Sequence, residues 1–206
     1  MDAVRKILVT GASGYVGGRL VTALLEDGAS VRVFVRDQKK AQSNSWASSV
    51  EISTGNASDY QSTLKALNGI HTAYYLLHSI NAGTNFDKIE SEMANNFAKA
   101  SEEAGVKQII YLGGINNDLK SSKHLNSRAN TGRSLASTSV PVMEMRAGII
   151  IGSGSASFEM LRHLTHRLPV MTTPKWVMNK THPLAVRDVL WYLKSAAKLE
   201  KPVSGI

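Results

Sequence analysis

The sequence predicts an α/β fold in which a doubly wound parallel sheet is covered by helices on both faces. Short apolar runs alternate with amphipathic stretches along the whole chain, which is the order of βαβ units. The first run, Ile7–Thr10, is continuous, as expected for a strand that is buried on both faces. A glycine-rich turn joins it directly to an amphipathic helix. These three observations favour a single domain over residues 1–206.

Hydrophobic periodicity and helix-ending residues place the other elements. Apolar residues recur at helical spacing from Val16 to Asp27, and Gly28 ends that helix. Ser58 is predicted to be the N-cap of a helix over Asp59–Leu67. We expect a polar helix or loop over Gln38–Ser48. Further strands are expected over Val31–Val35, Val50–Thr54, Ile70–Leu77, Lys107–Leu112 and Val142–Ile151, and further helices over Asn85–Ala104, His124–Ser137, Ser157–Leu168 and Ala185–Leu199.

The turn Gly11-Ala12-Ser13-Gly14-Tyr15-Val16-Gly17 carries the strongest functional signal. Between a strand and a helix, such a turn binds the pyrophosphate of a dinucleotide. Gly11 allows the tight turn, Gly14 lets the backbone approach the pyrophosphate, and Gly17 lets the helix pack close to the strand. The N-terminus of the helix adds unpaired N–H groups and a partial positive charge. The sequence therefore predicts a Rossmann-type dinucleotide-binding domain.

The end of the second strand indicates which dinucleotide binds. An acidic residue at this position bonds the ribose 2′-hydroxyl of NAD, whereas an arginine accommodates the 2′-phosphate of NADP. The strand ends in Arg36 followed by Asp37. Arg36 can pair with a phosphate in a bidentate manner, and Asp37 either caps the next helix or faces the ribose. We therefore expect NADP(H) in preference to NAD(H).

The spacing Gly-x-x-Gly-x-x-Gly resembles that of the extended and atypical short-chain dehydrogenase/reductase families. Gly55-Asn56-Ala57 is similar to the Gly-Asp pair that these families place against the adenine. Further family motifs are Tyr75–Ser79, Tyr111–Gly114, His124–Arg128, Arg146–Gly152, Gly152–Glu159 and Pro183–Val189. With these motifs the closest resemblance is to the NmrA-like, NAD(P)H-binding members, and it covers essentially the whole chain. Those members usually continue beyond the last helix seen here, so residues 153–206 resemble a truncated substrate-side region.

The resemblance implies a cofactor site at the carboxyl ends of the strands. Its predicted residues are Gly11, Ser13, Gly14, Tyr15, Val16, Gly17, Arg36, Asn56, Ala57, Leu77, His78, Gly113, Ala147 and Gly148.

The catalytic residues of the short-chain dehydrogenases are replaced in this chain. Those enzymes use a tyrosine as acid or base and a lysine one helical turn later that lowers its pKa. Here the corresponding helix carries His124 and Arg128, and the preceding strand ends in Gly113-Gly114 where a serine or threonine is usual.

Two interpretations of these replacements remain open. In the first, His124 is the proton donor, Arg128 orients the cofactor ribose or a substrate anion, and His78 faces the nicotinamide or the substrate. The protein would then reduce a small carbonyl or quinone-like acceptor. In the second, the domain binds NAD(P) without turnover, as a redox sensor or regulatory protein does.

Composition and charge exclude several other classes of protein. The formal charge is +8, but Lys and Arg are scattered and are not interleaved with aromatic residues, so we expect no nucleic-acid partner. The chain has no cysteine and no set of three metal ligands at a suitable spacing, so no metal is expected. We find no signal peptide and no apolar run of bilayer length, which predicts a cytoplasmic protein without a membrane partner. The resemblance makes Asn85–Ala104 a candidate homodimer face.

Overall fold

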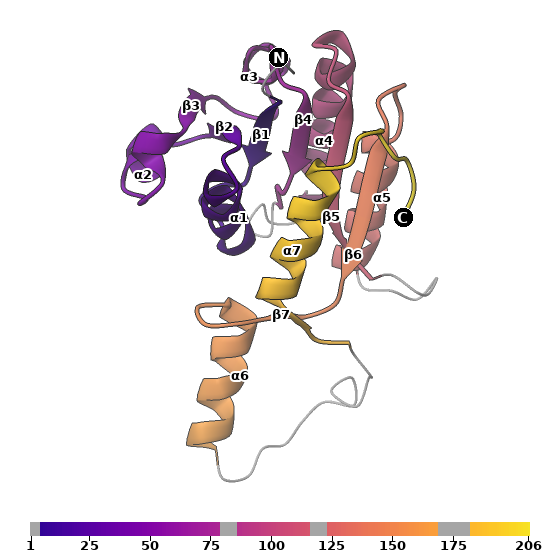
Figure 1. Cartoon of the computed structure of the whole chain (residues 1–206). Coiled ribbons are helices and arrows are strands. Elements are labelled where there is room, and N and C mark those ends of the chain that lie inside the picture. The colour runs from indigo at the N-terminus through magenta and orange to yellow at the C-terminus, as the bar shows by residue number, and fades with distance from the viewer. Residues whose placement is uncertain (1–4, 79–85, 116–122, 169–181) are drawn as a thin grey trace.

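The computed structural model describes residues 5–78, 86–115, 123–168 and 182–206 (Figure 1). Within these ranges, a six-stranded sheet has the order β3-β2-β1-β4-β5-β6, and every neighbouring pair is parallel. The strand order reverses between β1 and β4, which is the switch point of a doubly wound fold. The predicted Rossmann-type sheet is confirmed. Its strands are β1 Lys6–Thr10, β2 Ser30–Val35, β3 Glu51–Thr54, β4 Thr72–Tyr75, β5 Gln108–Gly114 and β6 Val142–Ala147.

Helices cover both faces of this sheet. Successive side chains of a strand point to opposite faces, so Ile7 and Val9 of β1 join one apolar cluster while Leu8 joins the other. The first cluster includes residues of α1 and α7, and the second includes residues of α3, α4 and α5. In Figure 1, α7 crosses in front of the sheet and α4 lies behind it. The helices are α1 Tyr15–Glu26, α2 Gln38–Gln42, α3 Tyr60–Leu67, α4 Phe86–Glu103, α5 Lys123–Leu135, α6 Ala156–Arg167 and α7 Val186–Ala197, with a short 3-10 helix at Ala47–Ser49.

The N-cap of α3 is Asp59, and the prediction of Ser58 was wrong. The carboxylate of Asp59 accepts hydrogen bonds from the backbone N–H groups of Gln61 and Ser62 at 3.3 and 3.1 Å. Ser58 lies one residue earlier, in a turn where its N–H donates to Oδ1 of Asn56 at 3.1 Å. Serine and aspartate are both good caps, so only the backbone position at which the helix begins distinguishes them.

The predicted strand Val142–Ile151 is also corrected. β6 ends at Ala147, where its partner β5 ends as well. The chain then leaves the sheet, and Ile150–Ile151 forms a separate strand, β7, that pairs with β8 (Leu184–Ala185). The apolar run continues through the break, so its pattern does not reveal that the hydrogen-bonding partner changes.

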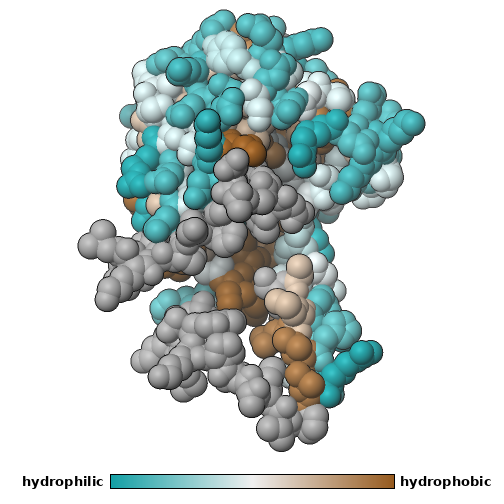
Figure 2. Space-filling model, turned by 180° about the vertical axis from the view of Figure 1, so that it is seen from behind, coloured by the Kyte–Doolittle hydropathy of each residue, from teal (hydrophilic) through white to brown (hydrophobic). Residues whose placement is uncertain are grey.

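The C-terminal elements have two different environments. α7 packs on the sheet, where the carbonyl of its Leu193 accepts a 2.6 Å hydrogen bond from the hydroxyl of Tyr74. α6 extends away from the sheet (Figure 1). Its apolar side chains add to the hydrophobic surface in the lower part of Figure 2. None of the described helices is long and apolar enough to cross a membrane. The exposed large apolar residues of α6 and its C-cap are Met160, Leu161, Leu164 and Leu168.

α4, the candidate homodimer face, lies between α3 and α5 on the sheet. Its solvent-exposed residues include Asp87, Glu92, Asn95 and Lys99, all of which are polar. The homodimer stays a prediction.

Candidate functional site

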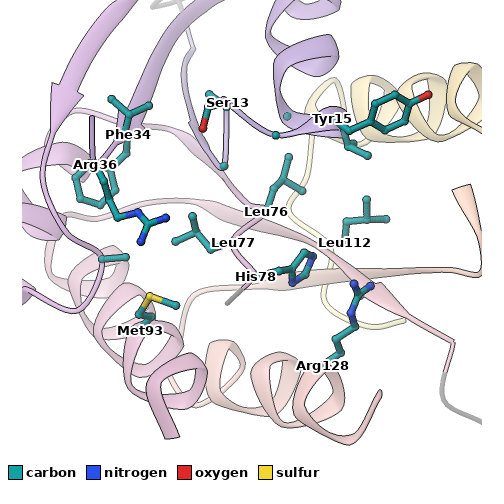
Figure 3. A pocket seen from close by; sticks show the side chains of 18 of the residues that line it. Ser13, Tyr15, Phe34, Arg36, Leu76, Leu77, His78, Met93, Leu112 and Arg128 are labelled. Carbon is teal, nitrogen blue, oxygen red and sulfur yellow. The ribbon is translucent and has the colours of Figure 1, made fainter. Parts of the chain in front are cut away.

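A cavity of about 880 Å³ lies at the carboxyl ends of the sheet strands, where ligands of doubly wound sheets bind (Figure 3). Every residue that the sequence predicts for cofactor binding lines this cavity. Arg128, one of the predicted catalytic residues, lines it as well. The structure thus brings together residues that follow six different strands.

The glycine turn between β1 and α1 forms one wall of the cavity. Gly11 has a φ of +66°, a conformation that glycine adopts without strain. A Cβ on Gly17 would lie 2.2 Å from the carbonyl oxygen of Gly11, so only glycine fits at this position. Gly14 is the N-cap of α1 and has no side chain to bond the N–H groups of the first turn. The N-terminus of α1 can therefore receive an anion.

Arg36 lies at the end of β2 and lines the cavity. The carboxylate of its neighbour Asp37 accepts a hydrogen bond from the backbone N–H of Lys40 at 3.1 Å. Asp37 is thus the N-cap of α2. Of the two roles open to this acid, the structure shows the cap, which leaves Arg36 as the charged group at this end of the cavity.

Gly55 and Asn56, which follow β3, lie near Arg36. A Cβ on Gly55 would lie 2.8 Å from the ring of Phe34 and 2.6 Å from the Cβ of Ser62. Glycine at this position therefore lets β3 pass close to Phe34 and α3. Asn56 uses its side-chain oxygen to accept the Ser58 N–H bond, which fixes the turn.

His78 and Arg128 are polar residues toward the end of the cavity that lies opposite Arg36 (Figure 3). The imidazole of His78 is accessible from the cavity. Desolvation by the surrounding protein, helped by the charge of Arg128 and opposed by that of Glu90, lowers the pKa of His78 to about 4. His78 is therefore neutral at pH 7 and can donate or accept a hydrogen bond.

Arg128 projects from α5 and lies against the end of β5. A Cβ on Gly114 would lie 3.1 Å from Cδ of Arg128, so the second glycine of the Gly113-Gly114 pair leaves room for this side chain. The hydroxyl of Tyr111 donates a 2.9 Å hydrogen bond to the carbonyl of Arg128. Burial raises the pKa of Tyr111.

The remaining predicted catalytic residue, His124, belongs to α5 by its backbone. Its side chain lies outside the described residues, so its predicted role stays a prediction. Sequence reasoning missed Ile89 and Met93, two apolar residues of α4 that line the cavity. Both belong to an amphipathic helix pattern that gives no sign of which residues reach the site. Among the residues whose placement is described, no group of three or more His, Asp or Glu could hold a metal ion.

A family model for the NmrA-like family matches residues 4–157. The chain belongs to the NmrA-like family. The matched region contains the whole six-stranded sheet, the glycine turn and the later lining residues of the cavity that the structure describes, which are Leu112, Gly113, Arg128, Ala147, Gly148 and Ile150.

Individual relatives of this NmrA-like chain include named reductases. The ceramide reductase of Caulobacter vibrioides is 26% identical over the whole chain, which covers 64% of that relative. The triphenylmethane reductase of a Citrobacter species, solved with NADP(H), has a TM-score of 0.76 at 20% identity and is matched over 96% of this chain and 67% of its own. An NADPH-dependent quinone oxidoreductase of Escherichia coli, solved with NADPH, has a TM-score of 0.63 at 22% identity, over 78% of this chain and 54% of its own. The chain spans between 31% and 64% of the length of the relatives found by sequence.

Proposed function

We propose that this chain is the cofactor-binding part of an NADP(H)-dependent reductase that acts on a carbonyl or quinone-like acceptor. The observation that carries the proposal is that one cavity at the switch point of the sheet has Arg36 at one end and Arg128 at the other. Relatives named as NADPH-dependent or solved with NADP(H) support it.

The residues of the cavity fit a dinucleotide. The N-terminus of α1, with Gly14 as its N-cap, offers N–H groups to the pyrophosphate. Arg36 would bind the 2′-phosphate, because Asp37 is engaged as a helix cap and does not compete for the arginine. Asn56 and Ala57 would lie against the adenine, and Ala147 and Gly148 against the nicotinamide, as the family resemblance implies.

Bound NADPH supplies a hydride to the carbonyl carbon of the acceptor, whose oxygen then takes a proton. Arg128 is a permanent cation and would orient the acceptor in the cavity so that its carbonyl carbon faces the cofactor. His78, neutral at pH 7, would hold the carbonyl oxygen of the acceptor by a hydrogen bond. His124 remains the proposed proton donor.

The test follows the loss of NADPH absorbance with a panel of quinones and aromatic aldehydes. We expect turnover with at least one acceptor, and a fall of about 100-fold in kcat/KM for Arg128→Met and for His124→Ala. Arg133→Met is the matched control, because Arg133 is an exposed arginine of the same helix, bonded to Asn130. Tight NADPH binding without turnover of any acceptor would contradict the proposed reductase activity.

That last outcome would favour a second candidate, an NAD(P)-binding regulator without catalysis. This candidate is favoured by the hydrogen bond and the raised pKa of Tyr111 on β5. The hydroxyl of Tyr111 is engaged with the carbonyl of Arg128, and its raised pKa makes it a poor proton donor and a poor base near neutrality. For a regulator, NADPH and NADP⁺ would bind with affinities that differ, and the bound state would alter binding to another macromolecule.

A further inference from the structure

Arg128 lies at the end of the cavity opposite Arg36 (Figure 3). Leu77 and His78 lie between the two arginines in this view. In the proposed mode of cofactor binding, the 2′-phosphate pairs with Arg36 and the pyrophosphate with the N-terminus of α1. All the phosphates of NADPH therefore have partners without Arg128.

Contacts from two other elements fix the position of Arg128. Its stem crosses Gly114, where a Cβ would come within 3.1 Å of Cδ. Its carbonyl accepts the hydrogen bond from Tyr111 on β5. The residue before it, Ser127, donates to the buried carboxylate of Glu90 on α4. Two of these contacts hold the backbone around Arg128 and one lies along its stem, which reduces the conformational freedom that the residue can lose when a ligand binds.

Among the described residues, no carboxylate forms an ion pair with Arg128. Glu144, the acid beside Gly113, is paired with Arg146 at 2.8 Å. The buried carboxylate of Glu90 accepts the hydrogen bond from Ser127 and forms no ion pair with Arg128 among the described residues. His78, the other polar group at this end that the figure labels, is uncharged at pH 7. A half-buried guanidinium in such surroundings favours an anionic ligand.

The cavity that Arg128 lines also has apolar walls. Leu112, Met93 and Ile89 line the same cavity and offer hydrocarbon surface. We propose that Arg128 anchors a carboxylate on an acceptor whose remaining surface is apolar, and so selects for acidic amphipathic substrates. This inference rests on the proposed function, because it places the acceptor at the end of the cavity away from Arg36.

The experiment compares decanoate with decanol, which have chains of equal length and differ in the head group. Binding is measured by calorimetry on the protein with and without saturating NADPH. We expect decanoate to bind at least about tenfold more tightly than decanol, as is typical of a hydrogen-bonded charge pair. Arg128→Met should remove that preference, Arg128→Lys should retain part of it, and the control Arg133→Met should leave it unchanged.

Gly114→Ala tests the placement of Arg128 without changing its charge. The added Cβ would push on the Arg128 stem and on Cδ2 of Leu125, each 3.1 Å away, so decanoate binding should weaken about threefold to tenfold relative to decanol binding. In the Arg128→Met background the same change should leave decanoate and decanol binding equal to each other, which is the expected result of a double-mutant cycle when one residue acts through the other.

Two results overturn the inference. One is equal binding of decanoate and decanol by the wild-type protein. The other is a preference for decanoate that survives Arg128→Met. If NADPH also binds about tenfold more weakly to this variant, Arg128 binds the cofactor ribose instead. Failure of the wild type to bind NADPH would contradict the proposed function, while the measurements without NADPH would still decide whether Arg128 anchors a carboxylate.

Discussion

The carbonyl oxygen of Gly11 lies where a side chain on Gly17 would begin, since a Cβ on Gly17 would be 2.2 Å from that oxygen. This contact joins the end of β1 to the first turn of α1. It keeps the N-terminus of the helix at the cavity wall, where its N–H groups can meet a phosphate. The phosphate-binding geometry therefore depends on the absence of one side chain.

Gly17→Ala should disrupt both the fold and cofactor binding. The added methyl group must push the turn away from α1, which we expect to lower the free energy of unfolding by about 2 kcal/mol or more. Gly18→Ala is the matched control, because its Cβ would lie 3.1 Å from the Ala12 carbonyl and alanine favours the helix. Urea unfolding and NADPH titration measure the two effects. Similar losses of stability and of NADPH affinity in the two variants would show that the Gly11–Gly17 contact does not cause the effect of Gly17→Ala.

Arg36→Ala should reduce the preference for NADPH over NADH. Removing a charge-assisted bond to the 2′-phosphate should weaken NADPH binding about tenfold to 100-fold and leave NADH binding within about twofold. Fluorescence titration with each dinucleotide measures this. Arg187→Ala, at an exposed arginine outside the cavity, is the control. An equal loss for both dinucleotides would mean that Arg36 does not bind the 2′-phosphate.

His78 should make the protein less stable in mild acid. Its pKa in the folded state is about 4, below the ordinary value of 6.5. Between these values the unfolded chain binds a proton that the folded chain does not, so the free energy of unfolding falls as the pH falls through this window. His78→Gln should reduce the stability difference between pH 7 and pH 5, as measured by urea unfolding. His182→Gln, at an exposed histidine, is the control. If His78→Gln shows the same stability difference between pH 7 and pH 5 as the wild type, the low folded-state pKa of His78 is contradicted.

Asp59→Ala should destabilise α3 more than Ser58→Ala does. Asp59 accepts two backbone hydrogen bonds at the start of the helix, and the loss of such a cap lowers the stability of the helix. Bonds from Ser62 lower the pKa of Asp59, so the stabilisation is present at neutral pH and is lost as the pH falls through the folded-state pKa. Urea unfolding at pH 7 measures both variants. A larger loss of stability for Ser58→Ala than for Asp59→Ala would show that Ser58, and not Asp59, caps α3.

The parts of the fold that follow from local patterns were predictable. The run Ile7–Thr10, the glycine turn and the helix that follows are contiguous, so their order in the sequence is their order in space. The division of Val142–Ile151 into two strands was not predictable, because the apolar pattern is the same whether the partner strand is β5 or β8. The choice between Ser58 and Asp59 as N-cap likewise depends on a backbone conformation that both residue types accept.

The sequence by itself determined the Rossmann-type sheet, the phosphate-binding turn and the arginine after the second strand, because each depends on neighbouring residues. Only the tertiary structure decided the position of Arg128 and the lining of the cavity that it enters. The space over Gly114, the bond from Tyr111 and the apolar side chains of Ile89 and Met93 come from segments far apart in the chain. The sequence indicates that a catalytic residue is missing from the glycine pair at the end of β5, whereas in the folded protein Gly114, the second glycine of the pair, leaves the space that the Arg128 side chain occupies.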